Sequence, residues 1–261
     1  MMVHRGAWTC PRRVKACVSL TDGVMDESIV ENLRRVRERI VAAAERSGRD
    51  PSRITLVVVT KGVTTDRLRK AVAAGATVLG ENRIQEALPK IKVLEETIRW
   101  HLIGHLQRNK VKQAIHRFEL IHSLDSLELA HEIEERAEQA GIRQRVLIQV
   151  NLSREPSKHG VLPEAADVLV RKTAALPHLA LEGLMTIPPP SIDPQQSRIY
   201  FRRLREKMEE LKQAGRPVRE LSMGMSNDFE VAIEEGATLV RIGTAIFGPR
   251  GSTEEREGGA E

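Results

Sequence analysis

Short apolar runs alternate with amphipathic stretches eight times along this chain of 261 residues, and this alternation limits the possible folds more than any other feature. The runs that we expect to form strands are 54–60, 77–80, 99–104, 118–122, 146–150, 179–185, 220–223 and 239–242. Strict alternation of strand and helix patterns predicts an α/β fold with a parallel sheet. Eight such units predict a closed TIM (β/α)8 barrel. A doubly wound open sheet is the alternative, but the loop after the first run, KGVTT, lacks the glycine fingerprint of a dinucleotide site.

The two ends of the chain lie outside this alternation. An extra helix precedes the first strand: its apolar residues recur every three or four positions from Ile29 to Ala44, after a cap at Asp26. Met25 directly precedes this pattern, so we expect residues 1–24 to be a disordered extension or the product of a mis-assigned start. We expect residues 25–248 to form one barrel domain. Residues 249–261 are rich in Gly and Glu and are expected to be a disordered tail.

Composition argues against several functional classes. The net charge of +5 does not indicate a nucleic-acid partner, because residues 1–24 hold four basic residues against one acid and no basic stripe alternates with aromatics. No run approaches the roughly 18 apolar residues of a membrane span. Both cysteines, Cys10 and Cys17, lie in the N-terminal segment, so the barrel contains no disulfide framework and a cytoplasmic location is expected.

The first apolar run is followed by a lysine. Six of the seven residues 54–60 are β-branched, which is typical of a strand buried on both faces. An ammonium at the end of such a strand is costly unless it is paired or used. Partial desolvation of Lys61 would favour the neutral amine, which can form a Schiff base. The side chain could equally extend into solvent, so Lys61 alone does not decide the function.

Two loops at the same rim of the barrel match a phosphate site. The loops after the last two runs read SMGMS (222–226) and RIGT (241–244) and supply hydroxyls and backbone amides at helix starts. Ser226 and Thr244 could instead only cap helices. Both loops together, facing a strand-end lysine, favour a phosphorylated ligand, either pyridoxal phosphate or a phosphosugar aldehyde.

Seven motifs make the chain recognisable. They are VVVTKG (57–62), LGENRIQE (79–86), WHLIGHLQRNK (100–110), IHSLD (121–125), LIQVNLSREPSKHG (147–160), LEGLMTIP (181–188) and LSMGMSNDFEVAIEEGATLVRIGTAIFG (221–248). From about residue 25 to residue 248 the chain resembles the pyridoxal phosphate homeostasis protein family, single-domain relatives of the alanine racemase N-terminal barrel. One departure is His105, where many members have proline; it affects the expected shape of that loop.

The resemblance implies a site for pyridoxal 5'-phosphate (PLP), in which Lys61 forms the internal aldimine. It also implies that Ser222, Gly243 and Thr244 hold the phosphate, with Met223 beside it. Arg241 would face the pyridine nitrogen, and Asn82 would lie near the cofactor ring. It further implies a role in intracellular PLP homeostasis. The expected partners are PLP and the apo-enzymes that receive it, with no nucleic acid and no membrane, and we expect a monomer.

Two residues argue against catalysis. A guanidinium such as Arg241 cannot accept the pyridine proton, so the nitrogen stays neutral and carbanion chemistry is damped. Racemases with this arrangement use a tyrosine from an additional domain. Here the single tyrosine is Tyr200, inside the pattern of a long helix, and we expect no further domain after residue 248. We therefore predict a non-enzyme with no catalytic residues; a PLP-dependent racemase or aldolase is the alternative.

Other polar residues carry weaker signals. His101 and His105 are four apart but straddle a strand and its loop, and no carboxylate motif lies between them, so we predict no metal site. Lys158, in the long polar loop 151–160, could receive the cofactor during transfer or simply be solvated.

Overall fold

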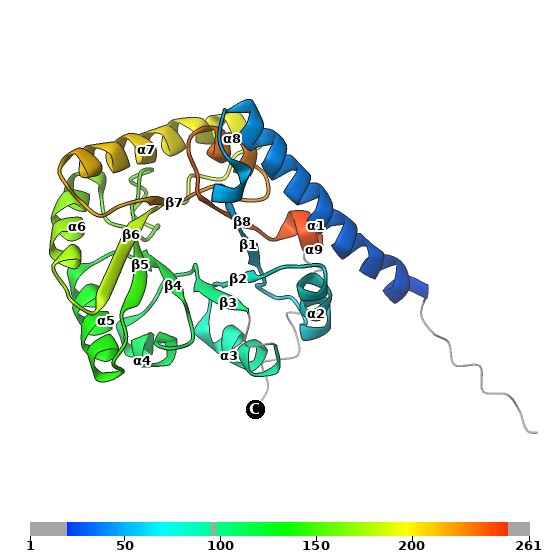
Figure 1. Cartoon of the computed structure of the whole chain (residues 1–261), viewed down its shortest axis with the longest axis horizontal. Helices are drawn as coiled ribbons and strands as arrows, with labels where there is room; N and C mark the ends of the chain where they lie inside the picture. The colour runs from blue at the N-terminus through cyan, green and yellow to red at the C-terminus, as the bar shows by residue number, and fades with distance from the viewer. Residues whose placement is uncertain (1–19, 95–97, 250–261) are drawn as a thin grey trace, which may run out of the picture.

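Eight parallel strands close into a barrel in the computed structural model, which describes residues 20–94 and 98–249 (Figure 1). The strands are β1 (Thr55–Val59), β2 (Val78–Glu81), β3 (Arg99–Leu102), β4 (Leu120–Leu124), β5 (Gln144–Gln149), β6 (Leu179–Met185), β7 (Glu220–Ser222) and β8 (Leu239–Ile242). Each strand pairs with its neighbour in chain order, and β1 closes the barrel on β8 with Val57 opposite Arg241. The predicted TIM barrel is therefore confirmed.

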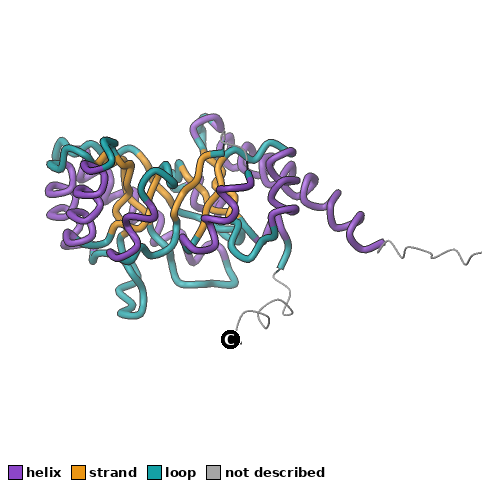
Figure 2. The backbone as a smooth tube through the Cα atoms, turned by 90° about the horizontal axis from the view of Figure 1, so that it is seen from below, coloured by secondary structure: helices purple, strands orange, loops and turns teal. Residues whose placement is uncertain are grey.

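Helices surround the strands (Figures 1 and 2). They are α1 (Leu20–Arg46), α2 (Thr65–Ala73), α3 (Ile84–Val93), α4 (Val111–Ala114), α5 (Leu127–Gln139), α6 (Ala166–Ala174), α7 (Arg198–Gln213), α8 (Phe229–Glu234) and α9 (Thr244–Phe247). Short 3-10 turns are η1 (Pro51–Arg53), η2 (Arg108–Lys110), η3 (Pro163–Ala165) and η4 (Pro194–Ser197). No helix in the described ranges is long and apolar enough to span a membrane.

Two helices differ from the sequence-based expectation. The extra N-terminal helix begins at Leu20, because helical hydrogen bonding continues through Asp26, where a cap was predicted. The stretch 107–116 forms a 3-10 turn followed by the four-residue α4, because the chain becomes extended at Ile115 and takes a positive φ at His116. The predictions for the ends of the chain concern residues that lie mostly outside the described ranges.

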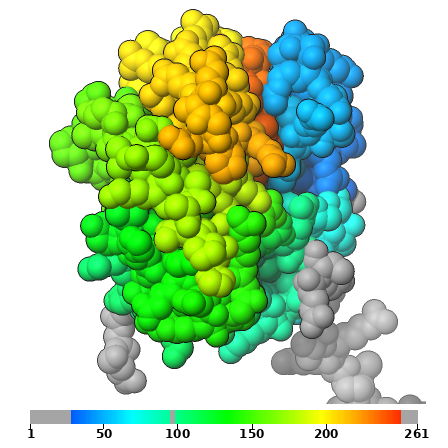
Figure 3. Space-filling view, turned by 60° about the vertical axis from the view of Figure 1, so that its left-hand side comes forward, coloured from blue at the N-terminus to red at the C-terminus, as the bar shows by residue number. Residues whose placement is uncertain are grey.

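Helix α1 covers the wall where the barrel closes. Asn32 donates a hydrogen bond to the carbonyl of Ile246 in α9 (3.1 Å), and Arg39 pairs with Glu230 in α8 (2.9 Å). In the space-filling view the blue α1 lies beside the orange part of the chain that follows β6 (Figure 3). The extra helix therefore supports the sector of the barrel that contains β8 and β1.

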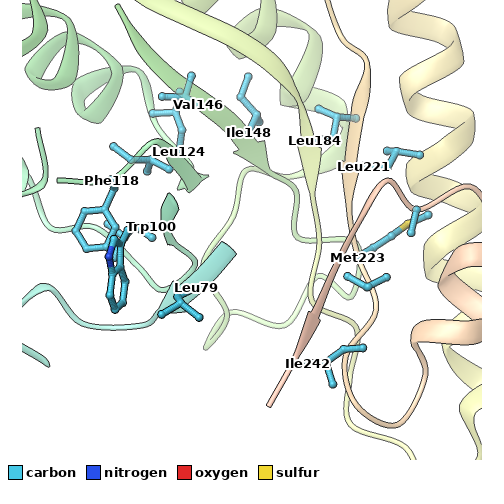
Figure 4. Packing of buried hydrophobic residues seen from close by; sticks show 14 of the residues in the cluster. Leu79, Trp100, Phe118, Leu124, Val146, Ile148, Leu184, Leu221, Met223 and Ile242 are labelled. Atoms are coloured by element: carbon cyan, nitrogen blue, oxygen red, sulfur yellow. The ribbon is translucent and has the colours of Figure 1, made fainter. Parts of the chain in front are cut away.

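The core consists of two layers, as a barrel requires. The larger hydrophobic cluster fills the space between strands and helices and contains aromatic side chains such as Phe229. Trp100 and Phe118 of this cluster are shown in Figure 4. A smaller cluster fills the barrel interior with Val57, Val78, Ile103, Leu120, Leu147, Met185 and Leu239. Strand alternation explains the division, since Val57 faces inward and Val58 faces the helices. Burial of one such side chain contributes about 1.5–3 kcal/mol.

Candidate functional site

The predicted lysine lies at the rim formed by the carboxyl ends of the strands. β1 ends at Val59, one residue before the predicted end of the strand at residue 60, and Lys61 lies in a turn with a half-buried side chain. Because Val58 pairs with Ile242, the chain that leads to Lys61 runs beside the chain that leads to Gly243. The structure therefore places Lys61 and the loop after β8 on neighbouring strands.

Arg241 begins a hydrogen-bonded chain of buried side chains that crosses the barrel interior. Its Nη1 donates to Ser222 Oγ (2.5 Å) and its Nη2 donates to the Thr186 carbonyl (2.9 Å). Ser222 Oγ is also 2.8 Å from His122 Nδ1, and His122 Nε2 is 3.0 Å from His101 Nδ1. The chain thus links β8, β7, β4 and β3 across the barrel.

Burial controls the charges in this chain. It lowers the pKa of Arg241 to about 10, with Asp228 opposing the shift, so the guanidinium remains charged at neutral pH. Burial also lowers the pKa of His101 to about 3 and that of His122 well below its ordinary value, and the nearby cations Arg145 and Arg241 act in the same direction. Both imidazoles are therefore neutral, and the buried cation has neutral oxygens as its hydrogen-bond partners.

The loops after β7 and β8 meet at one hydroxyl group. Ser226 Oγ accepts long hydrogen bonds from the backbone N–H groups of Gly243 (3.2 Å) and Ala245 (3.3 Å). A Cβ atom at Gly243 would lie 3.2 Å from Val59 Cβ, so this loop packs closely against the end of β1. Two N–H groups that converge on one oxygen beside the lysine strand form an arrangement that suits an anionic oxygen.

The remaining predicted residues lie at or directly after the ends of β2, β7 and β8. Thr244 is exposed at the first position of α9, and Asn82 is half-buried just after β2. Ser222 is fully buried and its hydroxyl is bonded to Arg241 and His122, so its contact with a phosphate stays a prediction. Met223 is fully buried in the outer hydrophobic cluster (Figure 4), and its place beside the phosphate also stays a prediction.

A buried ion pair next to Lys61 was not predicted. Lys90 of α3 donates to Glu81 Oε1 (2.6 Å) and to the carbonyl of Thr60 (2.7 Å), and the Thr60 hydroxyl donates to the same carboxylate oxygen (2.5 Å). Glu81 is fully buried, and its Oε2 has no hydrogen-bond partner among the described residues. The pair fixes the backbone at Thr60 and therefore the origin of the Lys61 side chain.

Two further residues can now be placed. Tyr200 lies in α7 and packs against the larger hydrophobic cluster. Among the described residues, no tyrosine therefore directly follows a strand at the rim. Lys158 Nζ is 2.9 Å from Glu155 Oε1, and its side chain is 24% exposed. An ion-paired ammonium is a poor nucleophile, because it must first lose both its proton and its partner.

Comparison with known proteins identifies the family of this chain. Residues 31–251 match the alanine racemase N-terminal domain family. The pyridoxal phosphate homeostasis protein of Aquifex aeolicus is 49% identical over 222 residues, which are 84% of this chain and 97% of that protein. The chain belongs to the pyridoxal phosphate homeostasis protein family. The resemblance noted from the motifs is thereby confirmed.

Solved structures support the same assignment. PipY of Synechococcus elongatus PCC7942, solved with PLP bound, has a TM-score of 0.74 and 34% identity over 84% of this chain and 100% of its own. Alanine racemase of Clostridium difficile 630 is 17% identical with a TM-score of 0.65, and the match covers 85% of this chain and 61% of that enzyme. At that identity the racemase shares the fold alone with this member of the homeostasis family.

Proposed function

We propose that this chain binds PLP covalently through Lys61 at the barrel rim and takes part in PLP homeostasis in the cytoplasm by holding and delivering the cofactor. The observation that carries the proposal is that the Gly243 and Ala245 N–H groups converge with long hydrogen bonds on the Ser226 hydroxyl, beside the strand that leads to Lys61. These N–H groups and the proton of that hydroxyl are donors that suit the phosphate of PLP. The aldehyde of PLP supplies the group with which a lysine amine condenses.

Arg241 supports the same ligand. Its guanidinium is buried and charged, and the hydrogen bonds it makes are to neutral oxygens, Ser222 Oγ and the Thr186 carbonyl. A buried cation without a bonded carboxylate is costly. The Arg241 guanidinium also has further N–H groups that can donate hydrogen bonds to an aromatic nitrogen. Arg241 then keeps the pyridine nitrogen unprotonated. Asn82 and Thr244 would complete the contacts with the ring and the phosphate.

Absorbance spectroscopy tests the binding proposal. We expect the full-length protein to take up PLP and turn yellow, and to lose this colour on borohydride reduction while Lys61 gains the mass of the reduced cofactor. Lys61→Ala should prevent reduction onto the protein, whereas Lys158→Ala, which changes a lysine in the loop after β5, should behave as the unchanged chain. Failure to take up PLP would instead favour a phosphosugar aldehyde as ligand.

Weak catalysis is the second part of the proposal. A neutral pyridine nitrogen damps carbanion formation, and the single tyrosine of the chain packs against the hydrophobic core from α7. Steady-state assays with D- and L-amino acids should therefore show little racemisation or aldol cleavage. Robust turnover would support a PLP-dependent racemase or aldolase instead. We further propose that the chain is a monomer and that apo-enzymes receive its PLP; sedimentation and transfer to an apo-enzyme test these two points.

A further inference from the structure

A group of three metal-ligating side chains lies at the barrel rim, outside the residues assigned to PLP. His105 follows β3, Asp125 follows β4 and His159 lies in the loop after β5, so three consecutive strands each contribute one residue. In barrel order β4 is opposite β8, which places this group across the rim from Arg241 and Gly243. We propose that His105, Asp125 and His159 bind a divalent transition-metal ion, with Zn²⁺ as the best fit.

The distances support a metal site. One potential ligand atom from each of the three residues lies within 4.8 Å of the other two, and His105 Nδ1 is 3.4 Å from Asp125 Oδ2. In a tetrahedral zinc site with bonds of about 2.0–2.2 Å, ligand atoms lie about 3.4 Å apart. The three atoms therefore need to approach by little more than 1 Å. The two imidazole rings are stacked, with centroids 3.7 Å apart and an interplanar angle of 7°, so their in-plane lone pairs run nearly parallel and the rings must tilt well apart to share an ion.

The backbone at each ligand is held in place. Gly104, which precedes His105, packs closely against the loop after β2: a Cβ atom at Gly104 would lie 2.2 Å from the Asn82 carbonyl oxygen. The Gly104 carbonyl accepts a hydrogen bond from the Ser123 hydroxyl (2.7 Å). The carbonyl of His159 accepts one from Gln149 (3.0 Å). The backbone beside the two histidines is therefore held in place, and rotation of the partly exposed imidazole side chains would turn their nitrogens toward a common ion.

The ligand set determines which ion fits. Imidazole nitrogen together with one carboxylate suits Zn²⁺ and its transition-metal neighbours, whereas Ca²⁺ and Mg²⁺ take oxygen ligands. An open cavity of about 440 Å³ adjoins the group and is lined by His105, Asp125 and Glu128 among others. This cavity leaves room for water in the remaining coordination positions. The bound ion would tie together the loops after β3, β4 and β5.

A competition titration of the untagged full-length chain against a chromophoric zinc chelator tests this site, and it does not depend on PLP. We expect one equivalent of Zn²⁺ to bind in the presence or absence of PLP, with no competition from Mg²⁺ or Ca²⁺. His159→Ala and Asp125→Asn should each weaken Zn²⁺ binding at least tenfold. Loss of a residue that only orients a metal ligand already costs about 10–100-fold in metal affinity, and these two residues would be ligands themselves. His131→Ala, which removes an exposed histidine of α5, should leave affinity unchanged.

The visible absorption of bound Co²⁺ gives a second readout. Co²⁺ substitution should produce visible absorption bands that disappear in His159→Ala, while circular dichroism confirms that this loop variant is folded. Zinc binding that survives both His159→Ala and Asp125→Asn, or that is lost equally in His131→Ala, would overturn the proposal. So would a chain that takes up no Zn²⁺ from the chelator.

Discussion

Arg241 Nη1 lies 2.5 Å from Ser222 Oγ inside the barrel, and the same hydroxyl is 2.8 Å from His122 Nδ1. Because a guanidinium can only donate, Ser222 accepts a hydrogen bond from Arg241 and can donate one to the neutral imidazole. This relationship makes Ser222 a link between the buried cation and the two histidines. Ser226, four residues later, is the hydroxyl that meets the N–H groups of the loop after β8.

The two serines should therefore respond differently to alanine substitution. We expect Ser226→Ala to weaken PLP binding about tenfold or more, because the Ser226 hydroxyl would donate to the phosphate and a hydrogen bond to a charged group contributes about 1.5–3 kcal/mol. Ser222→Ala leaves Arg241 Nη1 without its acceptor and His122 Nδ1 without its donor, and should cost about 1–3 kcal/mol of unfolding free energy. Titration of the apo-protein with PLP and urea unfolding of each variant measure the two effects. A larger loss of PLP affinity in Ser222→Ala than in Ser226→Ala would instead make Ser222 the phosphate ligand.

The buried histidines predict a loss of stability in acid. The pKa of His101 is lowered to about 3 and that of His122 is lowered well below its ordinary value, so the unfolded chain binds more protons than the folded chain below pH 6.5. The stabilisation is fully present above pH 6.5 and decreases as the pH falls toward about 3. Each histidine then contributes up to about 1.4 kcal/mol per pH unit.

Urea unfolding between pH 4 and pH 7.5 measures this dependence. The slope of unfolding free energy against pH should decrease in His101→Phe, which removes one titrating imidazole from among His122, Arg145 and Arg99. The exposed His131→Ala should retain the full slope. An unchanged slope in His101→Phe would show that its imidazole titrates in the folded state as it does in the unfolded chain.

The order of strands and helices could be predicted from the sequence, but the pairing of polar side chains could not. Eight apolar runs with helix patterns between them specify a parallel barrel, and its carboxyl rim then identifies Lys61, Asn82 and Thr244. The alternation of β4 marks His122 only as buried. Its hydrogen bonds to residues 21 and 100 positions away exist because the closed barrel brings β3, β4 and β7 around one interior.

The group of His105, Asp125 and His159 could not be predicted for the same reason. His101 and His105 are close in sequence, yet His101 faces the barrel interior and His105 lies outside β3. The partners of His105 are Asp125 and His159, which meet it only across three loops. The spacing of residues within a short stretch predicts which of them share one face of a helix or strand. Contacts between successive βα loops depend instead on how the barrel closes.

The ion pair beside the lysine strand gives the last prediction. Glu81 is fully buried and Lys90 is 11% exposed on its side chain, so Lys90→Met leaves a buried carboxylate without its cation. Loss of one partner of a buried pair costs about 3–5 kcal/mol of unfolding free energy. Arg69→Met, which breaks the exposed pair with Asp66, should change it by less than about 1 kcal/mol. Replacing both partners, as Glu81→Gln with Lys90→Met, should recover part of the loss because the stranded charge is removed. Urea unfolding that shows equal stability for Lys90→Met and Arg69→Met would mean that the Glu81 carboxylate reaches solvent or another donor once Lys90 is gone.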